Sequence, residues 1–110
     1  MEKRLSKFIN KTIYHGICRI VPNEEGETSA VLPTGVVFTG QISAIAAAGG
    51  GPISIVYVAQ VNTPTRNFRF KVLKDSEPYH LPHNMAYVGS DIAPVPVGGG
   101  CFHVYVEKEL

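Results

Sequence analysis

Histidine and cysteine side chains in the C-terminal third of the chain come closest to a constellation that could do chemistry. His80 and His83 lie three residues apart, and Cys101 and His103 lie two apart in a segment with strand character. A zinc ion takes four such ligands, or three and a water, and the chain contains neither a Cys-x-x-Cys nor a His-Glu-x-x-His pattern. Because nothing in the spacing brings the two pairs together, the sequence predicts no metal site and no cofactor.

The positions of the same residue types also disfavour nucleophilic catalysis. Cys18 and Cys101 lie in apolar segments, where a thiol usually acts as a small hydrophobic side chain. In a strand His15 and Cys18 would point to opposite faces, and His103 would lie about 7 Å along the strand from Cys101. No Gly-x-Ser-x-Gly turn is present. The sequence therefore predicts no catalytic residue, and an enzyme is the less favoured class of protein.

Two segments rich in Pro, Gly, His and Tyr could form the rim of a small-molecule pocket. They span residues 79–84 and 94–100. At the mouth of a small β-barrel such loops offer a rigid rim, and the polar groups would come from Tyr79, His80, His83 and Tyr87. The simpler interpretation is that both segments only connect strands.

Basic residues form two local clusters that bear on nucleic-acid binding. One is the N-terminal arm, with lysine or arginine at positions 3, 4, 7 and 11, and the other contains Arg66, Arg69 and Lys71. A β surface binds nucleic-acid backbone through such residues together with stacking aromatic rings. Phe68 and Phe70 alternate with Arg69 and Lys71, so they face the other way. Nucleic acid is therefore an alternative partner that is not favoured.

The elements that must position these residues are strands. In 110 residues the chain has 11 glycines and 8 prolines, at intervals too short for ordinary helices, and the segments between them are rich in β-branched and aromatic residues. We expect strands over 12–21, 28–32, 36–47, 53–61, 67–74, 85–90 and 101–107. The predicted fold is all-β and mainly antiparallel, a small sandwich or partly open barrel of about seven strands, with 1–110 as a single domain. Residues 1–11 form a basic arm that suits a short helix with Leu5, Phe8 and Ile9 on one face.

The absence of charge from the middle of the chain is the strongest pattern in the sequence. Residues 28–65 contain no Asp, Glu, Lys, Arg or His, although a half-exposed strand usually collects charge on its wet face. Apolar residues fall on both faces of the expected strands, and the interface candidates are Val36, Val37, Ile45, Val56 and Val58. A second copy of the chain would cover such a surface, so we expect a homo-oligomer, a dimer or larger. In the counter-interpretation one face is core and the other is an uncharged surface of Thr, Ser and Gln.

The composition and net charge exclude several classes of protein. Hydrophobic residues make up 45% of the chain, which excludes a disordered protein. The net charge of +1 excludes a strongly basic nucleic-acid coat. With neither a secretory signal nor a long apolar segment, we expect a soluble cytoplasmic protein with reduced thiols and no membrane partner.

Short motifs spread over most of the chain resemble one family. They are Tyr14 with Ile17, Glu27-Thr28, Leu32-Pro33-x-Gly35, Gly51-Pro52-Ile53, Arg66 to Phe70, Ala86-Tyr87-Val88-Gly89-Ser90 and Phe102-His103-Val104-Tyr105. On these residues the chain resembles a family of small, uncharacterised β-rich proteins carried by bacteriophages and other mobile elements, of the gene-cassette type. The resemblance implies a compact β-rich fold and a mobile-element origin, and it offers no catalytic residue.

These observations favour a non-enzymatic binding or interaction module that associates with itself, an accessory protein of a mobile element. A small-molecule pocket and a site for nucleic-acid backbone are the two alternatives.

Overall fold

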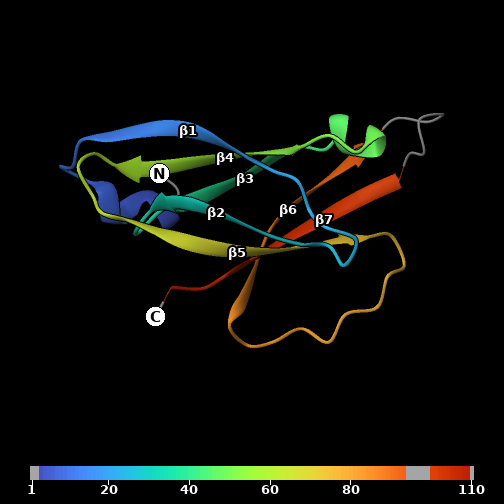
Figure 1. Cartoon of the computed structure of the whole chain (residues 1–110). Coiled ribbons are helices and arrows are strands. Elements are labelled where there is room, and N and C mark those ends of the chain that lie inside the picture. The colour runs from blue at the N-terminus through green and yellow to red at the C-terminus, as the bar shows by residue number, and fades with distance from the viewer. Residues whose placement is uncertain (1–2, 94–99, 110) are drawn as a thin grey trace.

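Two antiparallel sheets pack face to face in the computed structural model, which describes residues 3–93 and 100–109 (Figure 1). The first sheet has the strand order β1-β4-β3 and the second has the order β2-β5-β7-β6. The strands are β1 (Ile13–Ile20), β2 (Glu27–Pro33), β3 (Val37–Ser43), β4 (Ile53–Gln60), β5 (Thr65–Lys74), β6 (Met85–Ala93) and β7 (Gly100–Glu107). The all-β, antiparallel prediction is confirmed, and over the described residues the sheets form an open sandwich and do not close into a barrel.

The core lies between the two sheets and follows from strand alternation. Phe68 and Phe70 of β5 point inward and are almost completely buried, opposite Ile53 and Ile55 of β4. Phe38 of β3 meets both phenylalanine rings edge-on, with centroid distances of 6.4 and 5.9 Å. As the sequence predicted, Arg69 and Lys71 alternate with the buried rings and face outward.

The first strand of the β3–β4 hairpin is shorter than the strand predicted over residues 36–47. The strand predicted over 36–47 ends at Ser43, and Ala46–Gly49 forms a short 3-10 helix, η2. Three successive alanines have little strand propensity. The turn closes on Gly50, which has φ of +86° and donates its backbone N–H to the carbonyl of Ala47. A run of small residues therefore ends the strand earlier than its predicted end at residue 47.

The N-terminal arm contains a second 3-10 helix, η1 (Lys3–Phe8). Of the three residues expected on one helical face, Phe8 is buried, whereas Ile9 is exposed. A 3-10 helix has three residues per turn, so Leu5 and Phe8 share a face and Ile9 falls outside it. No helix in the described part of the chain is long and apolar enough to cross a membrane.

A β-bulge in β6 decides which of its side chains reach the outer surface. Tyr87 pairs with Tyr105 of β7, whereas Gly89 already pairs with Val104, so Val88 is one residue more than the partner strand supplies. Val88 is buried in the core, while Tyr87 and Ser90 both lie on the outer face. Without the bulge, two residues three apart would point to opposite faces.

Gly89 also permits a close approach between the sheets. A Cβ atom at this position would lie 2.6 Å from the backbone oxygen of Gly40 in β3. The backbone of an edge strand cannot move aside as a flexible side chain can, so the site accepts only glycine.

We expect Gly89→Ala to lower the free energy of unfolding by about 1–3 kcal/mol, the usual range for overpacking. Gly49→Ala is the matched control, because a Cβ there meets no atom within 4 Å and should change stability by less than about 0.5 kcal/mol. Urea titration followed by circular dichroism measures both values. Equal stability of the two variants would contradict the close approach.

Candidate functional site

The outer face of the four-stranded sheet carries most of the polar side chains that could bind or react. Lys71 of β5 lies opposite Tyr105 of β7, which in turn lies opposite Tyr87 of β6. One step further along β7, His103 lies between Leu73 and Ser90. The segment 75–84, which connects β5 to β6, arches below this face (Figure 1). Tyr79 of this segment covers part of the face, because its ring packs on that of Tyr105 with the two centroids 6.0 Å apart.

A chain of hydrogen bonds links four side chains on this face. The Ser90 hydroxyl lies 2.7 Å from Nδ1 of His103, and Nε2 of the same ring lies 3.0 Å from the Asp75 carboxylate. The Tyr87 hydroxyl forms a short hydrogen bond with the Ser90 oxygen. Because both ring nitrogens are engaged, the orientation of the imidazole is fixed.

Ser90, His103 and Asp75 are the residue types of a serine hydrolase triad. Their arrangement suits a serine that orients the imidazole better than one that attacks a substrate. A nucleophilic serine needs an oxygen open to substrate beside a base. The Ser90 oxygen already has two partners, Tyr87 and His103, in the middle of a strand. Its geometry is that of a support for the imidazole.

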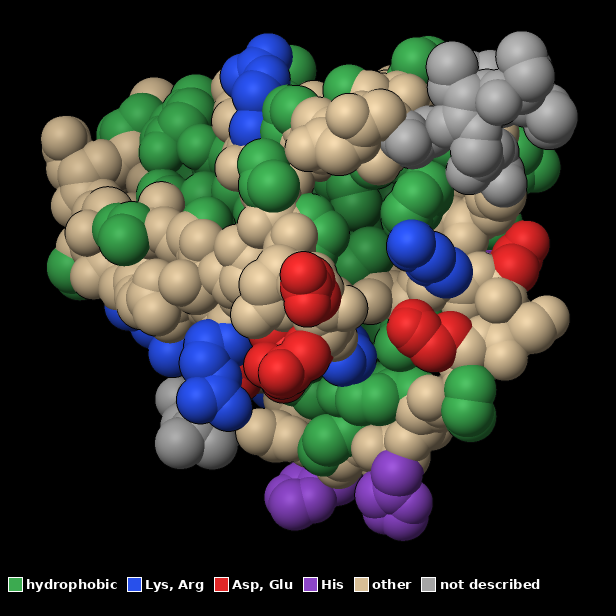
Figure 2. Space-filling model, turned by 45° about the vertical axis from the view of Figure 1, so that its right-hand side comes forward, with side chains coloured by type: hydrophobic (Ala, Val, Ile, Leu, Met, Phe, Trp, Pro, Cys, Tyr) green, Lys and Arg blue, Asp and Glu red, His purple; other side chains and the backbone are tan. Residues whose placement is uncertain are grey.

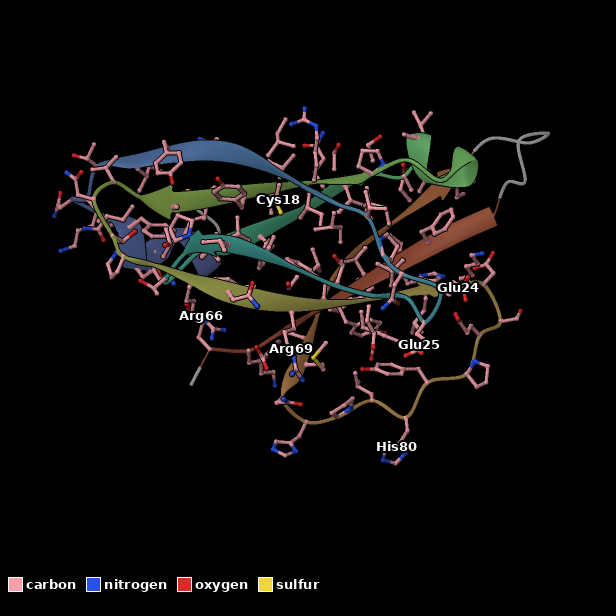
Figure 3. All side chains as sticks on the ribbon, viewed as in Figure 1. Cys18, Glu24, Glu25, Arg66, Arg69 and His80 are labelled. Carbon is pink, nitrogen blue, oxygen red and sulfur yellow. The ribbon has the colours of Figure 1, made fainter. Side chains whose placement is uncertain are left out.

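Cys101 lies at the end of the same cluster. Its backbone N–H donates to the second carboxylate oxygen of Asp75 at 3.3 Å. One donor atom from each of Asp75, Cys101 and His103 lies within 4.8 Å of the others, which is the one such trio among the described residues. Cys18, by contrast, is enclosed between the sheets (Figure 3), and its burial raises the pKa of its thiol and keeps it protonated.

A groove of about 400 Å³ opens beside the tyrosines, between the β2–β5 edge and the segment 75–84. Its lining residues are Glu27, Thr28, Arg69, Phe70, Lys71, Tyr79, Pro82, Asn84 and Met85. The Lys71 ammonium lies 5.5 Å from the Tyr79 ring and donates to the backbone carbonyl of Glu25. Arg69 projects from β5 toward the same side, with Nε 3.7 Å from the Glu107 carboxylate (Figure 3). Cations and the Tyr79 ring of the connecting segment therefore share this groove, whereas the Phe70 ring of β5 is buried in the core.

The residues predicted to line a pocket are not brought together. Tyr79 lines the groove, and Tyr87 belongs to the hydrogen-bonded chain with Ser90. His80 and His83 are exposed, and Figure 2 shows histidine side chains at the lower edge of the molecule, pointing into solvent. Of the other predicted rim segment, residues 94–99 lie outside the described part of the chain.

The three basic candidates for nucleic-acid binding also separate. Arg69 and Lys71 share the groove, but Arg66 has its guanidinium 4.2 Å from the Phe68 ring and 3.4 Å from the Glu109 carboxylate. That carboxylate also accepts the backbone N–H of Gly35. Glu109 therefore ties the C-terminal segment both to Arg66 of β5 and to the turn after β2.

The five residues predicted to form a dimer interface do not lie on one surface either. Val37 and Val56 lie on the outer face of the sheet β1-β4-β3, where both are partly exposed. Val58 belongs to that face by its pairing with Val37 but is fully buried, and Val36 packs against the core. Ile45 is exposed in the turn before η2.

No family model, curated protein or solved structure matches this chain. The resemblance to mobile-element proteins therefore stays a prediction.

The cluster of Asp75, Ser90 and His103 has no counterpart in the sequence analysis. Asp75 and His103 are 28 positions apart, and Ser90 reaches the cluster only because of the bulge in β6. The one hint in the sequence was the spacing of Cys101 and His103, which lie two residues apart in a strand and so on one face. In the structure this is the outer face of the sheet.

Asp75→Ala should lower the free energy of unfolding by about 1 kcal/mol, since it removes one hydrogen bond to the His103 ring and one to the Cys101 amide. The Cys101 amide should also exchange faster with deuterium. The control is Glu24→Ala, an exposed carboxylate in the loop after β1, which should change neither value. Unchanged exchange at Cys101 in Asp75→Ala would show that the carboxylate does not hold β7.

Proposed function

We propose that the protein is a non-enzymatic binding protein that associates with a second copy of itself through the outer face of the sheet β1-β4-β3. The observation that carries this proposal is a band of exposed apolar side chains on a face almost without charge. Ile17 is 52% exposed and lies opposite Val56, and Ile13 is exposed on the same side of β1. In Figure 2 hydrophobic side chains gather at the upper left, beside a basic side chain at the top, while Asp and Glu side chains lie lower on the molecule.

The chemistry of this face favours a copy of the chain as its occupant. Neither β3 nor β4 contains an Asp, Glu, Lys, Arg or His residue, and β1 adds only His15 and Arg19. A partner with a strong charge would gain little here, whereas a two-fold pairing places neutral apolar surface against itself.

The size of the face sets the expected strength. Three strands of seven to eight residues cover a projected area of about 350 Å², and flanking residues add to it. This is below the ~800 Å² per partner of a standard interface. The dimer should therefore be weak, with a Kd on the order of tens of micromolar.

Ile17→Glu and Val56→Glu should each raise the dimer Kd at least tenfold, because each buries an unpaired carboxylate at the centre of the contact. Sedimentation velocity from about 5 to 500 µM measures this. Val31→Glu is the control: Val31 is 66% exposed on β2 in the other sheet, and its variant should dimerise like the wild type. A wild type that stays monomeric at the highest concentration, or a control that dissociates equally, would refute the interface.

A second candidate function is the binding of a small anionic ligand with a planar ring in the groove beside Tyr79. The specific observation is that Arg69, Lys71 and the Tyr79 ring line one groove. Glu27 lies directly opposite Lys71 and offsets part of the positive charge, so a ligand with a single phosphate group fits better than a highly charged one.

AMP at millimolar concentration should raise the Tm and shift the amide resonances of β5, more than adenosine or inorganic phosphate alone. Lys71→Met should abolish the difference between AMP and adenosine, because it removes the cation and keeps the chain length. Lys108→Met, at an exposed position after β7, is the control. A short single-stranded dT oligonucleotide tests the nucleic-acid alternative, since binding to backbone weakens steeply with salt. Absence of any shift with all four probes would remove the groove as a ligand site.

A further inference from the structure

We infer that Asp75, Cys101 and His103 form a binding site for a divalent transition-metal ion of the zinc class. The three residues come from the end of β5 and from two outward positions of β7, and their donor atoms lie within 4.8 Å of one another. In a tetrahedral zinc site with bonds of 2.0–2.3 Å, ligand atoms are about 3.3–3.8 Å apart. The trio is therefore within about 1 Å of the required geometry.

The donor set selects the class of ion. A thiolate and an imidazole are ligands for zinc and its neighbours, whereas magnesium and calcium take oxygen ligands only. Of the three donors, the Asp75 carboxylate alone would suit magnesium or calcium.

The surrounding hydrogen bonds orient all three ligands. Ser90 contacts Nδ1 of His103 at 2.7 Å, which suits a proton on Nδ1 and leaves the Nε2 lone pair directed at the cluster. The Cys101 N–H donates to Oδ2 of Asp75 at 3.3 Å. The other carboxylate oxygen, Oδ1, lies 3.0 Å from Nε2 of His103 and is the one that faces the proposed metal position. A metal ion bound here would take the place of the hydrogen bond between Nε2 and this oxygen: the neutral ring keeps its one proton, on Nδ1, and coordinates through Nε2, while the Cys101 thiol gives its proton to water.

The site opens to solvent on one side. The Asp75 side chain is 62% exposed and that of His103 is 33% exposed. Three protein ligands and this exposure leave a fourth tetrahedral position for water or for a donor atom of a bound molecule. The site lies on the opposite side of the sandwich from the proposed dimer face, so it stands independently of that proposal.

Cobalt(II) tests the site directly, because a Co–thiolate bond gives charge-transfer absorption in the near ultraviolet. Titration of the reduced full chain should give one Co²⁺ per chain with this band, displaced by Zn²⁺ and not by excess Mg²⁺. Zn²⁺ should also slow alkylation of Cys101 at least tenfold.

Cys101→Ser should abolish the band, and His103→Ala and Asp75→Asn should weaken Co²⁺ binding more than 100-fold. Ser90→Ala should weaken it less, within the 10–100-fold range of a lost supporting group. The matched controls are Cys18→Ala and His83→Ala, the latter an exposed histidine outside the cluster, and both should bind like the wild type. Absence of the band in the wild type, or its survival in Cys101→Ser, would overturn the site. The wild-type titration decides even where a variant fails to fold.

Discussion

The pairing of β5 with β7 is the constraint on which both sides of the molecule depend. Residues more than thirty positions apart meet in this ladder, with Phe70 opposite Val106 and Val72 opposite Val104. All four side chains are buried against the other sheet. Because alternate residues point outward, the same register places Lys71 opposite Tyr105 and Leu73 opposite His103. Burial of the core thus fixes the geometry of the polar outer face.

Much of the fold could be predicted because it depends on local alternation and on turn residues. Seven strand segments, the all-β and mainly antiparallel class and the inward direction of Phe68 and Phe70 all follow from the alternation within each segment and from the residues between segments. The errors fall where small residues or an extra residue interrupt the pattern. The alanines of 46–48 form η2 in place of a strand end, and Val88 is the surplus residue of the bulge.

The candidate metal cluster could not be predicted, because two of its requirements depend on how distant segments pair. The sequence showed that Cys101 and His103 share a face, but it could not show that the turn after β5 brings Asp75 beside them. Nor could alternation alone place Ser90 on the outer face, since the bulge shifts it there. The groove shows the same limit: its aromatic ring, Tyr79, comes from a connecting segment whose path the strand pattern leaves undetermined.

The absence of charge from residues 28–65 has a structural explanation that combines both interpretations offered by the sequence. The segment supplies β2, β3 and β4, so it is divided between the sheets. Its inward side chains, such as Ile53 and Ile55, are core, and part of its outward surface is the uncharged Thr, Ser and Gln of the counter-interpretation.

What distinguishes the outer face of β1-β4-β3 is that Ile13 and Ile17 of β1, a strand outside the charge-free segment, extend the apolar surface beside Val56. The opposite face of the sandwich concentrates the titratable groups, including His103, Lys71 and Asp75. A two-fold contact through the neutral face would leave that polar face open in both subunits. Self-association and ligand or metal binding can therefore coexist in one small chain, because the two sheets keep them about one sandwich thickness apart.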